Sequence, residues 1–375
     1  MKQYLLAPGP TPIPPEVLAA MARPIIHHRT PEYEALFAEV RQGLRQLFQC
    51  GRDVLVFAAS GTGAMEGAVV NTCSPGDSVV VIRGGKFGER WAEICEAYSL
   101  RVIPVEVPYG KSVDPVAVAT TLRESPGVRA VFATHSETST GAVHDVQSLA
   151  AVTSRTDALL VVDAITSLGV MDLPMDTWGV DVVVAGSQKA LMLPPGLAFA
   201  ALSERAWAHV PDARLPKYYF DFSREQKAIA KNQSAYTPAV SLVAGLRESL
   251  RLILAEGLPA VFTRHARLAD ATRAGVQALG LALFADHPGA ACTAVKAPDG
   301  IEAGRIVKGL RARGITIAGG QGSMKGQIFR IAHMGYVDGF DVLTALGALE
   351  MVLAELRYPV TLGTGVRAAE ELLRS

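Results

Sequence analysis

Short apolar runs alternate with amphipathic segments along the first half of the chain. Five runs have the length and the β-branched content of buried strands, namely residues 54–58, 78–82, 130–134, 158–163 and 180–185. Between them, apolar residues recur with helical spacing over residues 63–72, 87–97, 116–124 and 146–154. This alternation predicts an α/β fold around a mostly parallel sheet. Ligands of such sheets bind at the carboxyl ends of the strands, so we look for chemistry there first.

The pattern changes toward both ends of the chain. Residues 7–15 are rich in proline and predict an ordered arm, followed by a helix over residues 15–21. A long helical pattern ends at Gly257, where we place a domain boundary. Beyond it we expect strands near residues 281–285, 291–296, 315–318 and 327–332, and helices over 260–279, 302–313 and 338–356. The prediction is therefore an arm (1–14), a large domain (15–257) and a smaller C-terminal α+β domain (258–375).

The composition narrows the possible classes of protein. The 375 residues are 49% hydrophobic and 19% charged, which excludes a disordered or collagen-like chain. The 36 basic residues balance 36 acidic residues, so an overall basic surface for nucleic acid is absent. The apolar runs fall far short of the about 20 residues that span a bilayer, and the first residues do not predict a signal peptide. The four cysteines lack the spacing of a metal site or a disulfide framework. We expect a cytoplasmic protein with no metal, nucleic-acid or membrane partner.

Two ionisable residues follow successive predicted strands. Lys189 comes after the run that ends at residue 185 and precedes a Pro-Pro-Gly turn, and in this desolvated position a lowered pKa would suit a Schiff-base lysine. Asp163 ends the previous run. Taken singly, Lys189 fits a lysine with a buried stem and Asp163 fits a helix cap. Together on one edge of the sheet they suit pyridoxal phosphate, whose aldehyde bonds a lysine and whose ring nitrogen pairs with a carboxylate.

A group of small residues after the first strand could bind the phosphate of such a cofactor. Ser60, Gly61 and Thr62 open a predicted helix, whose free N–H groups favour an anion. The glycine spacing misses the dinucleotide pattern, and no lysine completes a P-loop. A simple serine-capped helix is the alternative interpretation.

Several segments together resemble the class V aminotransferases, and within them the alanine/serine–glyoxylate (serine–pyruvate) aminotransferase family. They lie in the family's order along essentially the whole chain: residues 8–11 (PGPT), 60–62 (SGT), 85–90 (GKFGER), 134–141 (THSETSTG), 162–163 (VD), 187–189 (SQK) with 196–200 (GLAFA), and 246–250 (LRESL). The resemblance implies a fold-type I pyridoxal-phosphate transferase, with a mostly parallel seven-stranded sheet and a smaller C-terminal domain. It also implies a homodimer whose subunits share their active sites.

The resemblance further implies a role for each matching residue. Lys189 would bond the cofactor and later move a proton, Asp163 would hold the ring nitrogen protonated, and Arg330 would bind the substrate carboxylate. The implied cofactor contacts are Ser60, Gly61, Thr62 and Gln188 at the phosphate, Phe87 over the ring, Thr138 near the ring hydroxyl, and Thr237 at the phosphate of the partner subunit. The family tyrosine expected three residues before Thr237 falls on Ser234, with Tyr236 nearby, which leaves that contact open.

The implied reaction moves an amino group from a small amino acid, alanine or serine, to a 2-oxo acid, glyoxylate or pyruvate. Three alternatives stay open. A cysteine desulfurase-like lyase is suggested by Cys292 and opposed by Gln188 and Phe87, where desulfurases typically carry histidines. A 2-aminoethylphosphonate transaminase would need a second anion site. A non-catalytic subunit that retains the fold is opposed by the complete set of Lys189, Asp163 and Arg330.

Overall fold

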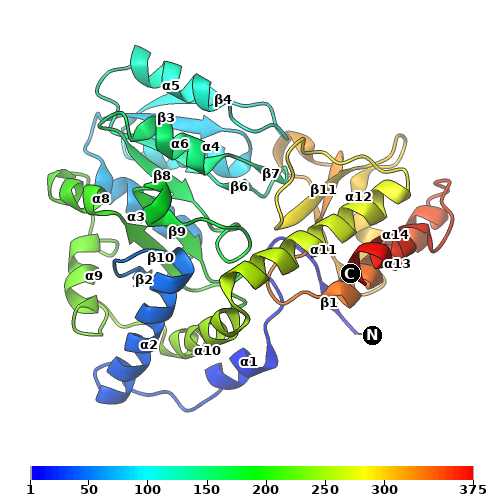
Figure 1. The fold of residues 1–375 in the computed structure, drawn as a ribbon, viewed down its shortest axis with the longest axis horizontal. Coiled ribbons are helices and arrows are strands. Elements are labelled where there is room, and N and C mark those ends of the chain that lie inside the picture. Colours follow the sequence, from blue (N-terminus) through cyan, green and yellow to red (C-terminus); the bar gives the residue numbers. More distant parts are fainter. Residues whose placement is uncertain (1, 375) are drawn as a thin grey trace.

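A central sheet of seven strands forms the body of the molecule (Figure 1). The computed structural model describes residues 2–374. The strand order is β2-β10-β9-β8-β5-β3-β4, and β10 alone runs antiparallel to its neighbours. The bounds are β2 Leu55–Phe57, β3 Ser78–Arg83, β4 Arg101–Glu106, β5 Ala130–Thr134, β8 Leu159–Asp163, β9 Val182–Gly186 and β10 Ala198–Leu202. All five strands expected in this half of the chain are present.

Two strands of this sheet have only weak signals in the sequence. β4 lies at the sheet edge, most of its residues are at least partly exposed, and Pro104 interrupts its pattern. β10 is fully buried but short and rich in alanine, a composition that suits a helix as well as a strand. Its pairing with β9 and β2 on either side decides its conformation.

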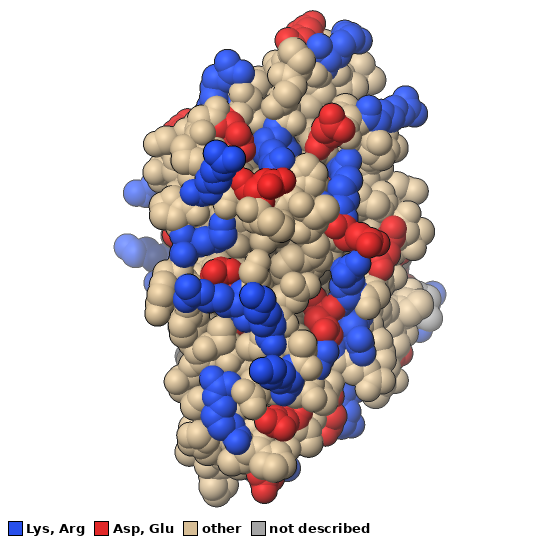
Figure 2. Space-filling view, turned by 90° about the vertical axis from the view of Figure 1, so that its left-hand side faces the viewer, with Lys and Arg blue, Asp and Glu red and all other residues tan. Residues whose placement is uncertain are grey.

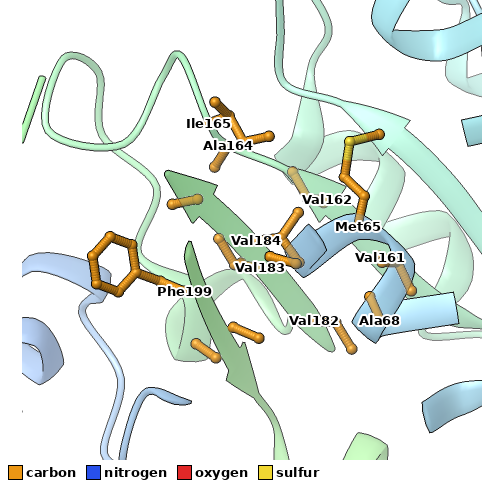
Figure 3. Close-up of a cluster of buried hydrophobic side chains, with 14 of the residues drawn as sticks. Met65, Ala68, Val161, Val162, Ala164, Ile165, Val182, Val183, Val184 and Phe199 are labelled. Atoms are coloured by element: carbon orange, nitrogen blue, oxygen red, sulfur yellow. The ribbon is translucent and has the colours of Figure 1, made fainter. Parts of the chain in front are cut away.

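Helices connect the strands and cover the sheet. Their bounds are α1 Pro15–Met21, α2 Pro31–Phe48, α3 Gly61–Thr72, α4 Lys86–Ala97, α5 Pro115–Glu124, α6 Val146–Thr153, α7 Met175–Trp178, α8 Glu204–His209, the 3₁₀ turn η1 Val210–Asp212, α9 Phe222–Ile229 and α10 Val240–Glu256. Met65 and Ala68 of α3 lie over Val161 and Val182 of the neighbouring strands β8 and β9 (Figure 3). Burying such a valine or methionine stabilises the fold by about 1.5–3 kcal/mol. This packing fixes α3 with its first turn at the carboxyl-end edge of the sheet.

The C-terminal part contains a second, antiparallel sheet of three strands in the order β11-β14-β13. The bounds here are β11 Cys292–Lys296, β13 Ala318–Gly319, β14 Ile328–Ala332, α11 Leu258–Ala278, α12 Ala303–Arg311, the 3₁₀ turn η2 Gly322–Met324, α13 Gly339–Glu355 and α14 Thr364–Leu373. Phe329 and Leu346 belong to a separate hydrophobic core in this part. The strand expected over residues 281–285 is wrong, because Leu283 forms only an isolated bridge with Val295 there.

The N-terminal arm contacts both parts of the molecule. Its strand β1 (Tyr4–Leu5) pairs in parallel with β12 (Ile315–Thr316) of the C-terminal part. Farther along the arm, the Thr11 hydroxyl donates a 2.7 Å hydrogen bond to the carbonyl of Lys189, which follows β9 of the seven-stranded sheet. The division of the chain at Gly257 stays a prediction. α10 ends there and α11 begins, although Val261 of α11 still packs in the first core.

The surface is mixed in charge. Figure 2 shows Lys and Arg side chains interspersed with Asp and Glu on the face that it presents, so neither sign dominates there. Within residues 2–374, no helix has both the length and the apolar character needed to cross a bilayer. The same residues contain no group of three or more His, Cys, Asp or Glu side chains that could hold a metal ion.

Candidate active site

The predicted Asp and Lys lie at the carboxyl-end edge of the large sheet. Asp163 is the last residue of β8, and its register partners are Thr134 of β5 and Val184 of β9. Lys189 follows shortly after Gly186, the last residue of β9. No ion pair of 4.0 Å or less joins the two side chains among the residues described here. Neither side chain has an ion-pair partner among these residues, which suits a ligand that carries a partner for each.

Burial lowers the pKa of Lys189 to about 8. Within this net shift, the charges of Cys292 and Asp163 oppose the effect of burial, and the positive charges of Arg330 and Arg90 add to it. The amine donates a hydrogen bond to the carbonyl of Pro8 in the N-terminal arm. A lysine with this pKa has a sizeable neutral fraction near pH 7 to 8, which makes it a nucleophile and a base.

The loop that carries Lys189 is fixed by its own side chains. The Ser187 hydroxyl donates to the carbonyl of Pro194 (2.7 Å) and accepts from the N–H of Leu197 (3.1 Å). These bonds close the loop across the Pro-Pro-Gly turn. The backbone on either side of Lys189 is therefore held in place.

Asp163 is a buried carboxyl group, 3% exposed. Burial raises its pKa to about 7, and the charge of Glu137 contributes in the same direction. One oxygen accepts the N–H of Ile165 (2.8 Å), which lowers the pKa. A positively charged group beside the second oxygen would favour the ionised form.

The first turn of α3 has the features of an anion site. Ser60 is its N-cap residue and makes no side-chain capping bond with the described residues, so the serine-capped alternative is wrong. Position 61 needs a glycine, because a Cβ there would lie 2.5 Å from the side chain of Ile165. The strand end packs closely against the same turn, since a Cβ on Gly186 would lie 3.3 Å from the Gly61 backbone. Arg90 donates a 3.3 Å hydrogen bond to the Thr62 hydroxyl. Backbone N–H groups of a helix start and a nearby guanidinium both favour an anion.

Phe87 lies on the first turn of α4, next to this anion site. The Arg90 guanidinium stacks 4.9 Å from the centroid of the Phe87 ring. Because Arg90 also contacts Thr62, one side chain connects the start of α3 with the aromatic ring. The ring is thus linked to the anion site at the start of α3 through Arg90.

The Arg330 side chain extends from β14 in the C-terminal part to the part of the molecule that contains the seven-stranded sheet. It is 4% exposed, and one terminal nitrogen donates to the carbonyl of Thr138 (2.8 Å). Its Nε and its other terminal nitrogen donate to the carbonyl of Gly319 (3.1 and 2.8 Å). These contacts use three of the five N–H groups of a guanidinium and leave one on each terminal nitrogen, which suits a bidentate carboxylate. The Thr138 hydroxyl is hydrogen-bonded to that of Thr166 (2.6 Å).

Two of the predicted cofactor contacts, Gln188 and Thr237, differ from each other in their surroundings. The side-chain oxygen of Gln188 is buried and accepts no hydrogen bond from residues 2–374, so it calls for a donor group. Thr237 is exposed and lines a surface pocket with Tyr219 and Tyr236. Ser234, where the family tyrosine was expected, donates to the carbonyl of Tyr236 (2.6 Å). No contact within the described chain brings Thr237 to Lys189.

The sequence analysis assigned no role to three groups that the structure brings to the site: Arg90, Glu137 and the carbonyl of Pro8. Each lies in a segment that resembles the family. Arg90 follows Phe87 by one helical turn, a spacing that places both on one helix face and could have paired them. The Pro8 carbonyl has no side-chain signal, so only the fold reveals it.

Comparisons with known proteins agree with this geometry. The profile of the family Aminotransferase class-V matches residues 3–336. A protein of Synechococcus sp. named soluble hydrogenase, small subunit, is 46% identical over 99% of this chain and 98% of its own. The L-aspartate–glyoxylate aminotransferase of Paracoccus denitrificans is 40% identical over 99% of this chain and 96% of its own. The structure of ureidoglycine–glyoxylate aminotransferase from Bacillus subtilis superposes with a TM-score of 0.95 at 30% identity, covering 100% of this chain and 99% of that one. The resemblance and the fold-type I architecture expected from the sequence are therefore confirmed, and the chain belongs to the class V aminotransferase family.

Proposed function

We propose that this aminotransferase uses pyridoxal phosphate to move an amino group from a small amino acid, alanine or serine, to a 2-oxo acid, glyoxylate or pyruvate. One observation carries the proposal. Lys189, with its lowered pKa, lies at one site with the buried Asp163 and with Arg330, which keeps two N–H groups for a ligand. The glyoxylate in the names of two relatives described above supports this choice of acceptor.

The residues present fit the cofactor. The uncapped start of α3 offers N–H groups to the phosphate, and Arg90 places a guanidinium beside Thr62 of the same turn. Ser60, Gly61, Thr62 and Gln188 would hold the phosphate end, Phe87 would cover the ring, and Thr138 would approach the ring hydroxyl. Pyridoxal phosphate, when bound, supplies an aldehyde that bonds amines and a ring that accepts electrons.

The chain's own residues would then do three things. Arg330 binds the substrate carboxylate through two parallel N–H bonds and so orients the α-carbon. The Nζ of Lys189 takes the proton from that carbon as a general base, which a pKa of about 8 permits near neutral pH. The free oxygen of Asp163 holds a proton on the nitrogen of the ring, in a site where burial strengthens this interaction.

A homodimer completes the proposal. Thr237 is exposed and lines a surface pocket with Tyr219 and Tyr236, which form an aromatic cluster with Tyr218. Aromatic clusters of this kind are typical of protein interfaces. Thr237 would reach the phosphate site of the partner subunit there. A cytoplasmic location is also proposed, and it is supported by the four free thiols of the chain.

Two alternatives rest on specific observations. The relative named as a hydrogenase subunit favours a non-catalytic role, but the complete set of Lys189, Asp163 and Arg330 has no chemical reason to persist in a scaffold. A lyase that uses a thiolate would need Cys292 to ionise. Burial raises the pKa of this thiol, and it is fully enclosed in β11. Both alternatives are therefore less well supported than the transaminase.

An absorbance experiment tests the proposal. Purified protein loaded with pyridoxal phosphate should show a visible band that shifts when alanine or serine is added and returns with glyoxylate or pyruvate. The donor panel includes aspartate, cysteine and 2-aminoethylphosphonate. Lys189→Ala should lose the band and turnover but keep its fold, because no other amine at the site is free to bond the aldehyde. Loading without any shift by amino acids would refute the transaminase.

A further inference from the structure

Glu137 is a buried carboxylate that has no role in the reaction described so far. It lies in β6 (Ser136–Glu137), which forms a short hairpin with β7 (Ala142–Val143), and its relative exposure is 0%. One carboxylate oxygen accepts the backbone N–H groups of Phe87 (3.1 Å) and Gly88 (3.0 Å). The other accepts the N–H (3.2 Å) and the hydroxyl of Ser139.

These bonds cap a helix from outside its own segment. α4 begins after Gly85, which has no side chain to cap the first turn. The Lys86 N–H donates to the hydroxyl of Ser139 (3.0 Å), so Glu137 and Ser139 together satisfy three N–H groups of that turn. A Cβ on Gly85 would lie 2.5 Å from the carboxylate, so the close approach requires glycine. A negative charge at a helix start is also favourable for the helix dipole.

The residue after Glu137 makes the contact to the C-terminal part. The carbonyl of Thr138 accepts the 2.8 Å hydrogen bond from Arg330. Glu137 therefore contacts α4 through its side chain, and the next residue, Thr138, contacts β14 through its backbone carbonyl. The ring of Phe87 and the guanidinium of Arg330 are attached to the same short segment.

We propose that Glu137 is a positioning residue that fixes Phe87 and Arg330 relative to each other, and so aligns the cofactor ring with the substrate carboxylate. The inference rests on the roles given to Phe87 and Arg330 in the proposed function. Glu137 itself touches neither ligand. It acts through the first turn of α4 and through its neighbour Thr138.

Two isosteric variants separate this role from general stability. Glu137→Gln keeps the shape of the side chain but removes its charge and turns an NH₂ group toward backbone donors. Glu350→Gln is the matched control, because Glu350 is also buried and accepts the N–H groups of Gly363, Gly365 and Val366 at the start of α14 (2.6–3.2 Å). Hydrogen–deuterium exchange of cofactor-free protein should rise about tenfold or more in residues 86–97 of the first variant only. In the control, residues 363–373 should respond instead.

Cofactor and substrate binding provide the second readout. Glu137→Gln should weaken pyridoxal phosphate binding about tenfold and raise the KM for the amino donor, while Glu350→Gln leaves both unchanged at a similar loss of Tm. Unchanged exchange in residues 86–97, or equal weakening of binding by both variants, would overturn the proposal. If the wild type fails to bind the cofactor, the proposed function falls, and the exchange data still decide whether Glu137 fixes α4. Should Glu137→Gln not fold, Ser139→Ala removes the hydroxyl's bonds to Lys86 and Glu137 but leaves the carboxylate on Phe87 and Gly88, and it is expected to show a smaller change in the same residues.

Discussion

At the scale of single residues, the site is defined by ionisable groups whose pKa values are shifted by burial. The pKa of Lys189 is lowered to about 8 and that of Asp163 is raised to about 7, in both cases chiefly by burial. Each shift reflects a cost of holding the charged form in a protein interior. The cofactor-free enzyme therefore gives up stability at the residues on which the proposed reaction depends.

Asp163→Asn should stabilise the cofactor-free protein above neutral pH. The pKa of Asp163 is raised from 3.8 to about 7 on folding, so the folded state binds more protons between these values and stability falls as pH rises through that window. The cost is complete above about pH 7, and asparagine avoids it. The expected gain in unfolding free energy is at most on the order of a few kcal/mol. Denaturant unfolding at about pH 5 and pH 8 measures it, and a gain that does not grow with pH would contradict the prediction.

Arg330→Lys should impair the use of amino acids and oxo acids while leaving cofactor affinity nearly unchanged. Lysine keeps the charge but loses the planar fork that presents two N–H groups beyond the bonds to Thr138 and Gly319. A loss of roughly ten- to a hundred-fold in kcat/KM corresponds to about 1.5–3 kcal/mol, as expected for a hydrogen bond to a charged group. Steady-state kinetics with alanine or serine and glyoxylate measure it beside the Kd of pyridoxal phosphate. A variant that handles amino acids like the wild type would assign Arg330 a structural role only.

At the scale of elements, the site depends on loops that are closed by their own hydrogen bonds. The loop after β9 is tied by Ser187, and the first turn of α4 is capped by Glu137. Both elements place side chains at the carboxyl-end edge of the sheet. The positions of Lys189 and Phe87 are therefore properties of these elements and not of the two side chains alone.

Ser187→Ala should loosen the loop of Lys189. The change removes a donor to Pro194 and an acceptor for the N–H of Leu197, and we expect a loss of about 1–3 kcal/mol in unfolding free energy together with weaker cofactor retention. Ser203→Ala is the control, because Ser203 caps α8 and bonds Asp181 on the opposite edge of the sheet. Thermal unfolding and cofactor dissociation rates are compared for both. Equal effects on cofactor release would show that the loop bonds of Ser187 have no special part in holding Lys189.

At the scale of the whole molecule, the site joins distant parts of one chain and, as proposed, two chains. Arg330 donates to Thr138 across 192 residues of sequence, and Lys189 bonds Pro8 across 181. Among residues 2–374, no such contact involves the side chain of Thr237. A second copy of the chain would supply it.

Mixed dimers test this arrangement. If each site takes Lys189 from one subunit and Thr237 from the other, a hybrid of Lys189→Ala and Thr237→Ala subunits contains one site with both changes and one intact site. Refolding the two variants together at limiting pyridoxal phosphate should therefore restore about half of the wild-type activity per hybrid dimer, whereas each variant alone stays impaired. Sedimentation confirms dimer formation. Activity equal to the sum of the separate variants would place Thr237 outside the shared site.

The sequence by itself determined the strand and helix alternation and the residues that follow each strand. Buried parallel strands need continuous apolar runs, and their carboxyl ends meet at one edge, so Asp163, Lys189 and the small residues from Ser60 onward could be placed together from local pattern alone. The resemblance in short motifs added Phe87, Thr138 and Arg330. None of these inferences requires knowledge of how distant segments pack.

Only the tertiary structure decided the rest. The antiparallel direction of β10, the capping of α4 by Glu137 and the contact of Pro8 with Lys189 all join segments far apart in the chain. The pKa values of Asp163 and Lys189 likewise depend on burial by many neighbours, which a local pattern does not report. The physical reason is that periodicity records which face of an element is buried, whereas a carbonyl, a charge or a carboxylate acts on whatever the fold brings within a few ångströms.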